Sequence, residues 1–360
     1  MDRELRDNET VAECHFLDVG QGTCNIILLG DRRGIVIDCG SSISGRVPLL
    51  LLRRYIDQIV ALVVSHNDKD HQGGASAIIA AYPKAIDRVF LLQDRPIEHI
   101  ALYGVLKRVL EEGNLLSEPI RLERDDLPRV VFSESTKDLS LELIYPTFQA
   151  NLDAQKSAQP NRTSAVLVLF CGKRKIVYPG DSSIGDWRQI REYLGEPILA
   201  DILNVPHHGG NICEHRQKGQ SVAEYELREK QSLDWLYSEG VRCKFAVVSV
   251  GTINNYGHPK SATISALKSS HAEVICTQIT QSCYDDLEKL RPGVRRAVFH
   301  SQSRGSCDLT SGARSRNVAC AGTVIAEISR DSVTIRGFDE HQMGVEKLAA
   351  NDGHPLCRNS

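Results

Sequence analysis

One polar stretch that follows an apolar run constrains this chain more than any other segment. Residues 59–64 are all apolar and predict a buried strand, whereas residues 75–81 predict a helix. Between them residues 65–74 read SHNDKDHQGG, where the side chains able to bind a metal are His66, Asp68, Asp70 and His71. Imidazole nitrogen and carboxylate oxygen suit Zn²⁺, Mn²⁺ or Fe²⁺, and the motif has no thiolate to favour a softer metal. A simple polar loop needs none of this spacing, so the stretch predicts a metal site at the end of a strand.

The composition is ordinary for a folded, water-soluble protein. The chain has 360 residues, of which 41% are hydrophobic and 25% charged, so it can bury a large core. No apolar run approaches the roughly 20 residues that a membrane helix requires. Residues 1–13 form a polar leader that lacks the apolar centre of a secretion signal. We therefore expect a cytoplasmic protein with no membrane partner.

The alternation of apolar strands and helices predicts an α/β fold with two sheets covered by helices on their outer faces. Residues 14–275 are expected to form the main domain, with insertions near 95–137 and 212–235. Residues 276–360 are expected to be a Cys- and Arg-containing extension packed on the same domain. Further predicted elements are helices at 47–56, 186–194 and 261–269, a polar, highly charged excursion at 214–228, and a hairpin at 323–335.

The cysteines are expected to be free thiols or metal ligands. There are 11 of them, and without an export signal disulfides are disfavoured. Four lie in apolar strands and are expected in the core: Cys24, Cys39, Cys171 and Cys243. In the tail, a structural zinc site is conceivable from Cys283, His300, Cys307 and Cys320, although buried thiols without a metal are favoured.

Charge gives little evidence for nucleic-acid binding. The net charge of −3 provides no global basic surface, although a local basic groove stays open. The arginine-containing segment 291–316 is interpreted foremost as a solvated loop. The functional alternative is that its arginines contact a phosphate backbone.

Three further groups of acidic or histidine residues also follow apolar strands: Asp181, the pair His207 and His208, and His258. A single histidine after a strand is most often a satisfied polar residue. Because strand-end loops present catalytic groups on a rigid scaffold, the repetition instead indicates one shared site with the 65–74 motif. The other histidines are interpreted as structural or surface residues.

These groups sit within motifs that occur in a fixed order. The motifs are FLDVGQG at 16–22, IDCG at 37–40, the 65–74 stretch, PGD at 179–181, VPHHG at 205–209 and YGHP at 256–259. Spanning roughly residues 14–275, they resemble the metallo-β-lactamase fold superfamily, and within it the β-lactamase-like domain of ComEC-type competence proteins. The resemblance implies a four-layer αββα sandwich. It also implies two divalent metal ions, zinc or manganese, with magnesium as a third candidate.

The resemblance assigns roles by position. His66 and Asp68 would bind the first metal, Asp70 and His71 the second, with Asp181 bridging the two and His258 the last ligand of the second. His207 or His208 stands where phosphodiesterases of the superfamily keep a histidine near the leaving group, and is counted with Asp70 as catalytic. Asp18 and Asp38 would brace the ligand loops.

Two departures from the superfamily pattern concern the first metal. Asp68 replaces a histidine of the usual HxHxDH motif, which makes the site harder and favours Mn²⁺ or Mg²⁺ more than an all-histidine site would. A histidine expected before the bridging aspartate is also missing, since residues 161–164 read NRTS. His207 could supply that ligand and leave His208 as the acid, and the sequence does not separate these alternatives.

The resemblance implies a metal-dependent phosphodiesterase, foremost a nuclease that hydrolyses DNA with a metal-activated hydroxide. Such a protein would suit DNA processing or anti-phage defence, with protein partners in a multi-subunit system. One alternative is a small-substrate metallohydrolase acting on a cyclic nucleotide or lactone, lidded by the two insertions. Another class is a metal-bound sensor or interaction subunit with little turnover. The joint presence of Asp70, His71, Asp181 and His258 argues against that last class.

Overall fold

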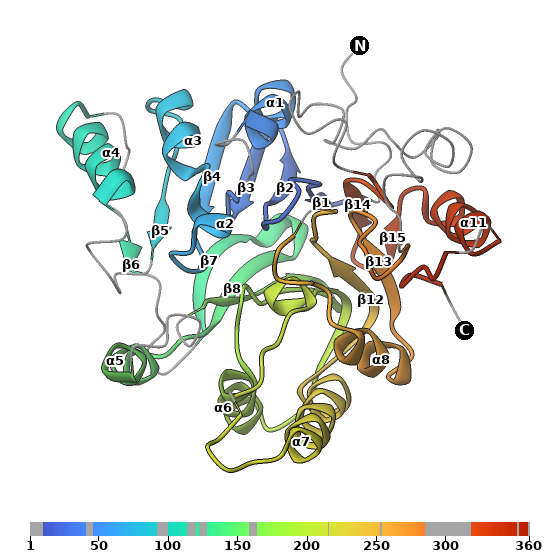
Figure 1. The fold of residues 1–360 in the computed structure, drawn as a ribbon. Coiled ribbons are helices and arrows are strands. Elements are labelled where there is room, and N and C mark those ends of the chain that lie inside the picture. The colour runs from blue at the N-terminus through green and yellow to red at the C-terminus, as the bar shows by residue number, and fades with distance from the viewer. Residues whose placement is uncertain are drawn as a thin grey trace.

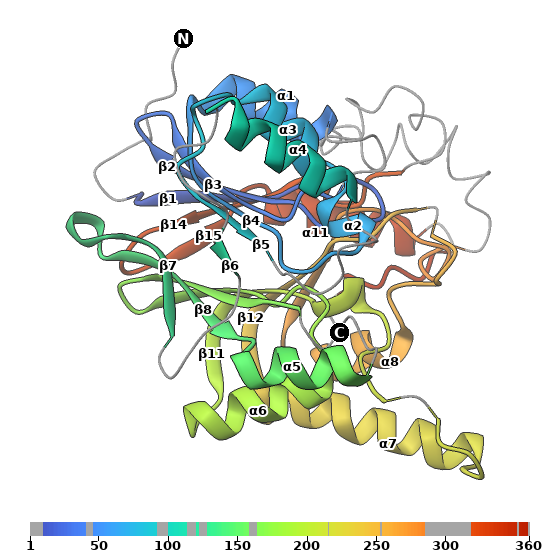
Figure 2. The ribbon, with the colours of Figure 1, turned by 90° about the vertical axis from the view of Figure 1, so that its left-hand side faces the viewer.

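The protein consists of two β-sheets stacked face to face between layers of helices (Figures 1 and 2). The computed structural model describes residues 10–40, 46–91, 100–113, 120–121, 128–157, 164–214, 216–252, 254–284, 318–350 and 353–358. Within these residues the layers follow the four-layer αββα sandwich that the motifs imply.

The first sheet has eight strands in the order β15-β14-β1-β2-β3-β4-β5-β6. Strands β3 to β6 run parallel, so the chain must cross over between them, and helices α1, α3 and α4 cover the outer face there (Figure 2). The strands are β1 Ala12–Phe16, β2 Asn25–Gly30, β3 Arg33–Ile37, β4 Gln58–Val63, β5 Val89–Leu91, β6 Ile120–Arg121, β14 Val324–Ile328 and β15 Val333–Ile335. The helices are α1 Arg46–Tyr55, α2 Lys69–Gln72, α3 Ala75–Ala81 and α4 Ile100–Glu111.

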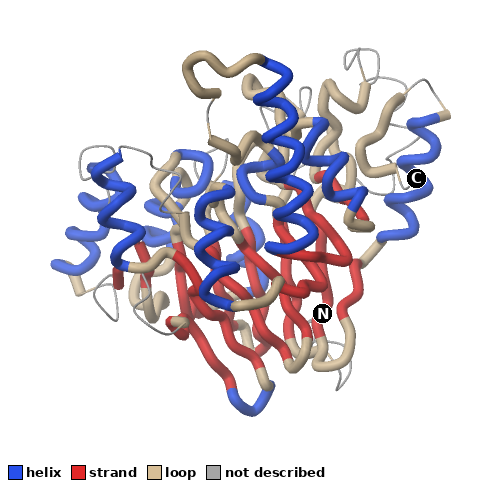
Figure 3. Tube along the Cα trace, turned by 90° about the horizontal axis from the view of Figure 1, so that it is seen from below, coloured by secondary structure: helices blue, strands red, loops and turns tan. Residues whose placement is uncertain are grey.

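The second sheet has seven strands in the order β13-β12-β11-β10-β9-β8-β7. Strands β10 to β13 are parallel, and helices α6, α7 and α8 connect them in turn across the outer face (Figure 3). The strands are β7 Arg129–Glu134, β8 Leu139–Tyr145, β9 Val166–Cys171, β10 Arg174–Tyr178, β11 Ile198–Asn204, β12 Val241–Val248 and β13 Glu273–Cys276. The helices are α5 Phe148–Ser157, α6 Ile184–Leu194, α7 Val222–Trp235, α8 Ser261–Ser269 and, after the last strand, α11 Phe338–Ala349.

The core lies in three layers, because each sheet is buried on both faces. Strand β9 shows how the sequence achieves this. Its side chains alternate, so that Leu167 and Leu169 face the space between the sheets while Val166 and Val168 pack against the helices. A strand buried on both faces must be apolar throughout, which explains the continuous apolar runs of the sequence.

The layers bring two edges of parallel strands together. The chain leaves β4 at Val63 and reaches the 65–74 motif, and it leaves β10 at Tyr178 and reaches Asp181. The two sheets touch closely there, since a Cβ atom on Gly180 would lie 2.2 Å from the Ser164 Oγ and 2.9 Å from the Ser65 Oγ. The strand-end motifs of the two sheets therefore meet in one place.

Most predicted elements are confirmed, including the helices at 75–81 and 261–269, and the hairpin at 323–335 as β14 and β15. Cys24, Cys39, Cys171 and Cys243 are buried as expected. No described helix has the length and apolar character needed to cross a membrane.

The charged excursion predicted at 214–228 contains, in its second half, the start of helix α7, which the sequence did not predict. Helix α7 begins with a capping box in which the Ser221 hydroxyl accepts from the Glu224 N–H and the Glu224 carboxylate accepts from the Ser221 N–H. The helix is polar because little of it is buried, so the apolar periodicity that would have revealed it is absent.

Replacing Leu169 by alanine is expected to destabilise the protein by about 2–5 kcal/mol, because it leaves a cavity between the sheets. Leu199 on β11 is 62% exposed, so Leu199→Ala is a matched control with an expected change within about 0.5 kcal/mol. Urea unfolding followed by circular dichroism measures both. Equal midpoints for the two variants would contradict the buried position of Leu169.

Candidate metal centre

Asp38, just after β3, fixes the geometry of the 65–74 motif. Its carboxylate accepts from the Ser65 N–H at 2.7 Å and from the Ser65 hydroxyl at 2.8 Å. The same carboxylate lies 2.8 Å from Nδ1 of His71. A carboxylate at Nδ1 fixes the ring so that Nε2 faces the opposite side, the usual arrangement behind a metal-binding histidine. Asp38 therefore occupies the bracing position expected for it.

Glycines let two neighbouring loops approach the backbone of the motif. A Cβ on Gly40 would lie 1.6 Å from the Asp70 carbonyl oxygen, and one on Gly22 would lie 2.8 Å from it. That carbonyl accepts from the Thr23 N–H at 2.9 Å, and the His71 carbonyl accepts from the Cys39 N–H at 2.6 Å. The DVGQG and IDCG motifs thus hold the ligand-bearing loop in place.

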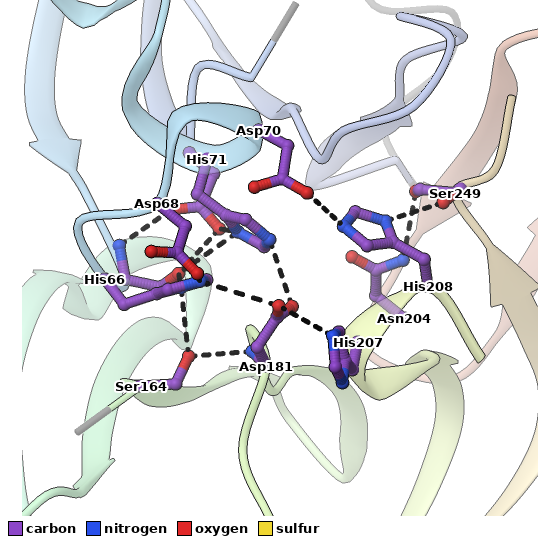
Figure 4. Close-up of polar contacts among 12 residues, drawn as sticks. His66, Asp68, Asp70, His71, Ser164, Asp181, Asn204, His207, His208 and Ser249 are labelled. Atoms are coloured by element: carbon purple, nitrogen blue, oxygen red, sulfur yellow. Dashed lines mark hydrogen bonds and ion pairs between the residues drawn. The ribbon is translucent and has the colours of Figure 1, made fainter. Parts of the chain in front are cut away.

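The Asp181 carboxylate lies at the middle of the site and is buried (Figure 4). Its Oδ1 lies 3.0 Å from Nε2 of His71, and its Oδ2 lies 3.6 Å from Nε2 of His66 and 3.7 Å from Nε2 of His207. Its backbone N–H donates to the Ser164 hydroxyl at 2.7 Å. The side chain that the sequence singled out in the PGD motif thus connects both sheets.

His208 and Asp70 form a second group beside the first. Nε2 of His208 lies 3.3 Å from the Asp70 Oδ2, while its Nδ1 lies 2.8 Å from the Ser249 carbonyl oxygen, which orients the ring. His207 and His208 both have positive φ, 53° and 55°. Two adjacent non-glycine residues in this region are strained, and such strain is concentrated at functional sites.

His258 and Asp68 lie at the margins of these groups. The His258 ring is 5.2 Å from the His207 ring and 5.6 Å from that of Tyr256, measured between centroids. Asp68 lies 3.7 Å from Nε2 of His66, and its side chain is 45% exposed. The structure therefore places the eight predicted site residues around one centre, with His208 beside Asp70 and His258 beside His207.

The donor atoms fit divalent cations. Among the described residues, one potential ligand atom each from His66, His71 and Asp181 lie within 4.8 Å of one another, and so do those of Asp70, His71 and His208. Nε2 of His66, His71 and His208 are buried, and each faces a carboxylate oxygen at 3.0–3.6 Å. Such nitrogen and oxygen donors suit Zn²⁺ or Mn²⁺.

The pKa values of the residues in the centre indicate which protons a bound cation would displace. Burial lowers the pKa of His66, but the Asp181 carboxylate outweighs burial and raises that pKa to about 9. Burial also lowers the pKa of His71, but the carboxylates of Asp181 and Asp38 outweigh it and raise that pKa well above its ordinary value. Although burial opposes it, His71 and His66 hold the pKa of Asp181 well below its usual range. Protons on His66 and His71 thus balance the central carboxylate when no metal does.

His258 behaves in the opposite way. Burial, followed by the neighbouring His207 and His208 and by Lys260, lowers its pKa to about 4. Its Nδ1 is buried without a hydrogen-bond partner. His258 is therefore neutral at pH 7, with a lone pair available.

Sequence reasoning did not identify Ser164, whose hydroxyl lies 3.3 Å from Nδ1 of His66. The signal was present, because Ser164 ends the segment 161–164 where the superfamily histidine is missing. Residues 161–163 lie outside the described residues, as do His300, Cys307 and the arginine-containing segment 291–316.

Metal affinity is expected to rise with pH from about 6.5 to 9. Only neutral imidazole binds a metal, and the His66 pKa is raised from 6.5 to about 9, so binding must displace its proton. By the same linkage, the stability that the proton on His66 gives the metal-free protein is fully present below pH 6.5 and is lost as pH approaches 9. Titration calorimetry with Mn²⁺ in buffers of different ionisation enthalpy measures the proton release. A pH-independent affinity without proton release would contradict these pKa directions.

Comparisons with known proteins show what this chain is similar to. The model of the metallo-beta-lactamase superfamily matches residues 18–132. The chain is 24% identical over 286 residues to ComE operon protein 3 of Bacillus subtilis, covering 74% of this chain and 32% of that protein. It is 25% identical over 256 residues to Recombination protein 2 of Haemophilus influenzae, covering 70% of this chain and 26% of that one.

The chain thus spans about a third or less of the length of these curated relatives. Among solved structures, the metallo-beta-lactamase fold protein YhfI from Bacillus subtilis aligns with a TM-score of 0.41 and 12% identity, covering 74% of this chain and 96% of that one. On the motifs, the two-sheet architecture and the family match, this chain has the metallo-β-lactamase fold, with a domain similar to that of the ComEC-type competence proteins.

Proposed function

We propose that the protein is a metal-dependent phosphodiesterase that hydrolyses DNA. The observation that carries this proposal is a pair of adjoining sets of ligand atoms that share His71, one of which contains the buried Asp181 carboxylate. A pair of divalent ions bound there would activate the attacking water and neutralise charge on the phosphate. Zn²⁺ and Mn²⁺ fit the mixed nitrogen and oxygen donors, and Mg²⁺ fits the carboxylate oxygens among them.

The contacts divide the ligands between the two ions. His66 and Asp68 would hold one ion, since their side chains face each other at 3.7 Å. Asp70, His71 and His208 would hold the other, and Asp181 would bind both. This division follows the roles expected from the sequence except at one position, where His208 takes the place given to His258.

His207 is the side chain best placed to protonate the leaving oxygen. Its Nδ1 lies 3.1 Å from the Asn211 carbonyl oxygen, so as an imidazolium it keeps one N–H on that carbonyl and presents the other at Nε2. Its side chain is 26% exposed, whereas that of His208 is 1% exposed, so a substrate can reach His207. The neutral His258 lies beside the His207 ring, with the two ring centroids 5.2 Å apart.

Nucleic acid is the proposed substrate class for two reasons. The curated relatives are named for competence and recombination, which supports a role in DNA handling. Next to the centre, Tyr256 is 65% exposed and its ring lies 5.6 Å from that of His258, so it offers a surface on which a base can stack. Lys260 donates to the Tyr256 carbonyl at 2.8 Å and adds a cation near a bound phosphate.

The relatives named for competence and recombination support a role in DNA processing. We propose with it a cytoplasmic location, within a multi-protein system that processes DNA or defends against foreign DNA. This setting is inferred by analogy with the relatives, whereas the hydrolytic role is inferred from the residues of the centre.

Replacing His71 or Asp181 by alanine is expected to lower DNA hydrolysis by more than about 100-fold, since loss of a ligand exceeds the 10–100-fold effect typical of a residue behind a ligand. Linear, circular and single-stranded DNA with Mn²⁺, Mg²⁺ or Zn²⁺ are the substrates. His271→Ala, at an exposed position, is the matched control and should retain activity.

Cleavage by Asp181→Ala at the wild-type rate would overturn the proposal. A metal-loaded protein that hydrolyses bis-p-nitrophenyl phosphate but no nucleic acid would instead favour a small-substrate hydrolase. A protein that binds metal but hydrolyses neither substrate would favour a metal-bound sensor or interaction subunit.

Tyr256→Ala is expected to weaken substrate binding without removing the chemistry. Stacking of a base on an aromatic ring contributes about 1–3 kcal/mol, so KM for single-stranded DNA should rise by roughly tenfold while kcat changes little. Tyr193→Ala, at a tyrosine that is 42% exposed on α6, is the control. An unchanged KM in steady-state kinetics would show that the Tyr256 ring does not contact the substrate.

A further inference from the structure

A second cluster of metal-ligand side chains lies outside the centre described above. The Cys320 Sγ is 3.3 Å from Nε2 of His341 and 4.0 Å from the Cys357 Sγ. The three ligand atoms all lie within 4.8 Å of one another, and the three residues are no more than 3% exposed. They come from separate segments, namely the loop before β14, helix α11 and residues 353–358.

Cys276, the last residue of β13, adjoins this cluster through Cys357. Its backbone N–H donates to the Cys357 sulfur at 3.1 Å, and its thiol interacts with the Cys357 thiol. N–H groups that donate to sulfur are the kind of outer contact that orients a thiolate ligand of a metal. The cluster therefore offers three sulfurs and one imidazole nitrogen from four different segments.

We propose that Cys276, Cys320, His341 and Cys357 bind a structural zinc ion. Three cysteines and one histidine are a common closed set for structural zinc. With Zn–S near 2.3 Å and Zn–N near 2.0–2.1 Å, ligand atoms of a tetrahedral ion lie about 3.5–3.8 Å apart. The observed separations of 3.3 Å and 4.0 Å fall on either side of that range.

A disulfide and plain core packing both fit the cluster less well than a zinc ion does. In a disulfide the sulfur atoms are only about 2.0 Å apart. Core packing accounts for buried thiols, but not for an imidazole nitrogen that faces two sulfurs, because a buried polar atom is costly unless it has a strong partner. A zinc ion satisfies the thiolates and the imidazole together.

The proposed site differs from the zinc set considered from the sequence. Cys320 is common to both, whereas His300 and Cys307 lie outside the described residues. Cys276 is chosen over Cys283 because its N–H donates to the Cys357 sulfur and its thiol interacts with the Cys357 thiol. The positions 276, 320, 341 and 357 are too far apart to form a recognisable zinc motif, since structural sites are usually signalled by ligands two to five residues apart. Only the fold brings them together.

The ion would attach the last part of the chain to the second sheet. The loop that carries Cys320 already lies on the end of β13, where the Thr277 carbonyl accepts from the Cys320 N–H at 2.9 Å and the Cys276 carbonyl accepts from the Ala321 N–H at 3.0 Å. A zinc ion would add α11, through His341, and residues 353–358, through Cys357, to this attachment. Its role would be to stabilise the fold rather than to take part in hydrolysis.

Metal analysis of the purified full-length chain tests this proposal. Cys320→Ala, His341→Ala and Cys357→Ala are each expected to lose one zinc ion per chain and to have a lower Tm. Cys243→Ala, at a buried cysteine outside the cluster, and Cys283→Ala should keep the ion. Asp181→Ala should also keep it, which separates this site from the hydrolytic centre. Retention of the wild-type zinc content by both Cys320→Ala and Cys357→Ala would overturn the proposal. Loss of zinc in Cys283→Ala, but not in Cys276→Ala, would overturn the assignment of Cys276 as a ligand.

Two measurements need no variant that must fold. After replacement of zinc by Co²⁺, thiolate-to-cobalt charge-transfer absorption is expected in the near ultraviolet, and the hydrolytic centre cannot produce it because its proposed ligands include no cysteine. Titration of the native protein with a mercurial should release zinc in proportion to the thiols modified. Absence of the cobalt band, or a Cys320–Cys357 disulfide found by mass spectrometry of the native protein, would contradict the proposal.

Discussion

The metal centre depends on one carboxylate that binds no metal in the arrangement proposed. Asp38 accepts two hydrogen bonds from Ser65 and lies 2.8 Å from Nδ1 of His71, so it fixes both the start of the 65–74 motif and the direction of its last histidine. Since His71 belongs to both sets of ligand atoms, an error in its orientation would disturb both. The backbone beneath is held equally tightly, because Gly40 approaches the Asp70 carbonyl where no side chain would fit. Hydrogen bonds from residues that do not bind the metal orient the ligands, so short loops can hold them at well-defined separations.

The second sheet contributes the charge that the first cannot supply alone. Asp181 follows the end of β10 and reaches His66 and His71 of the first sheet. The centre therefore requires the two sheets to be stacked. Without a metal, His66 and His71 retain protons to balance that carboxylate, as their raised pKa values show. A cation that displaces these protons adds its binding free energy to the stability of the contact between the sheets. The strained pair His207 and His208 lies at this contact, where the surrounding hydrogen bonds can hold it.

Local patterns in the sequence predicted the strands, most helices and the identity of the residues around the centre. They succeeded because strands buried on both faces must be apolar, and because ligands at strand ends follow those strands directly. The order of ligands around the centre was less accessible. The choice between His208 and His258 depends on which ring faces Asp70, and this is fixed by a contact of His208 with the Ser249 carbonyl, 41 residues away. Helix α7 was missed because most of its residues are exposed, so no apolar stripe marks it in the sequence. The cysteine cluster was missed because its members meet only through tertiary structure.

The two clusters differ in chemistry in a way that matches their positions. The centre around Asp181 has carboxylates and imidazoles, and it keeps one histidine, His207, accessible to a substrate. The cluster around Cys320 is buried and rich in sulfur, which suits a closed site that excludes water and substrate. The two are nevertheless connected through the chain. Two residues after Cys276, the Gln278 side chain donates to the Asp18 carboxylate at 2.5 Å, and Asp18 begins the DVGQG loop that holds the Asp70 carbonyl. An ion that fixes the end of β13 would therefore also steady the loop behind the hydrolytic centre, so that one metal site supports the geometry of the other.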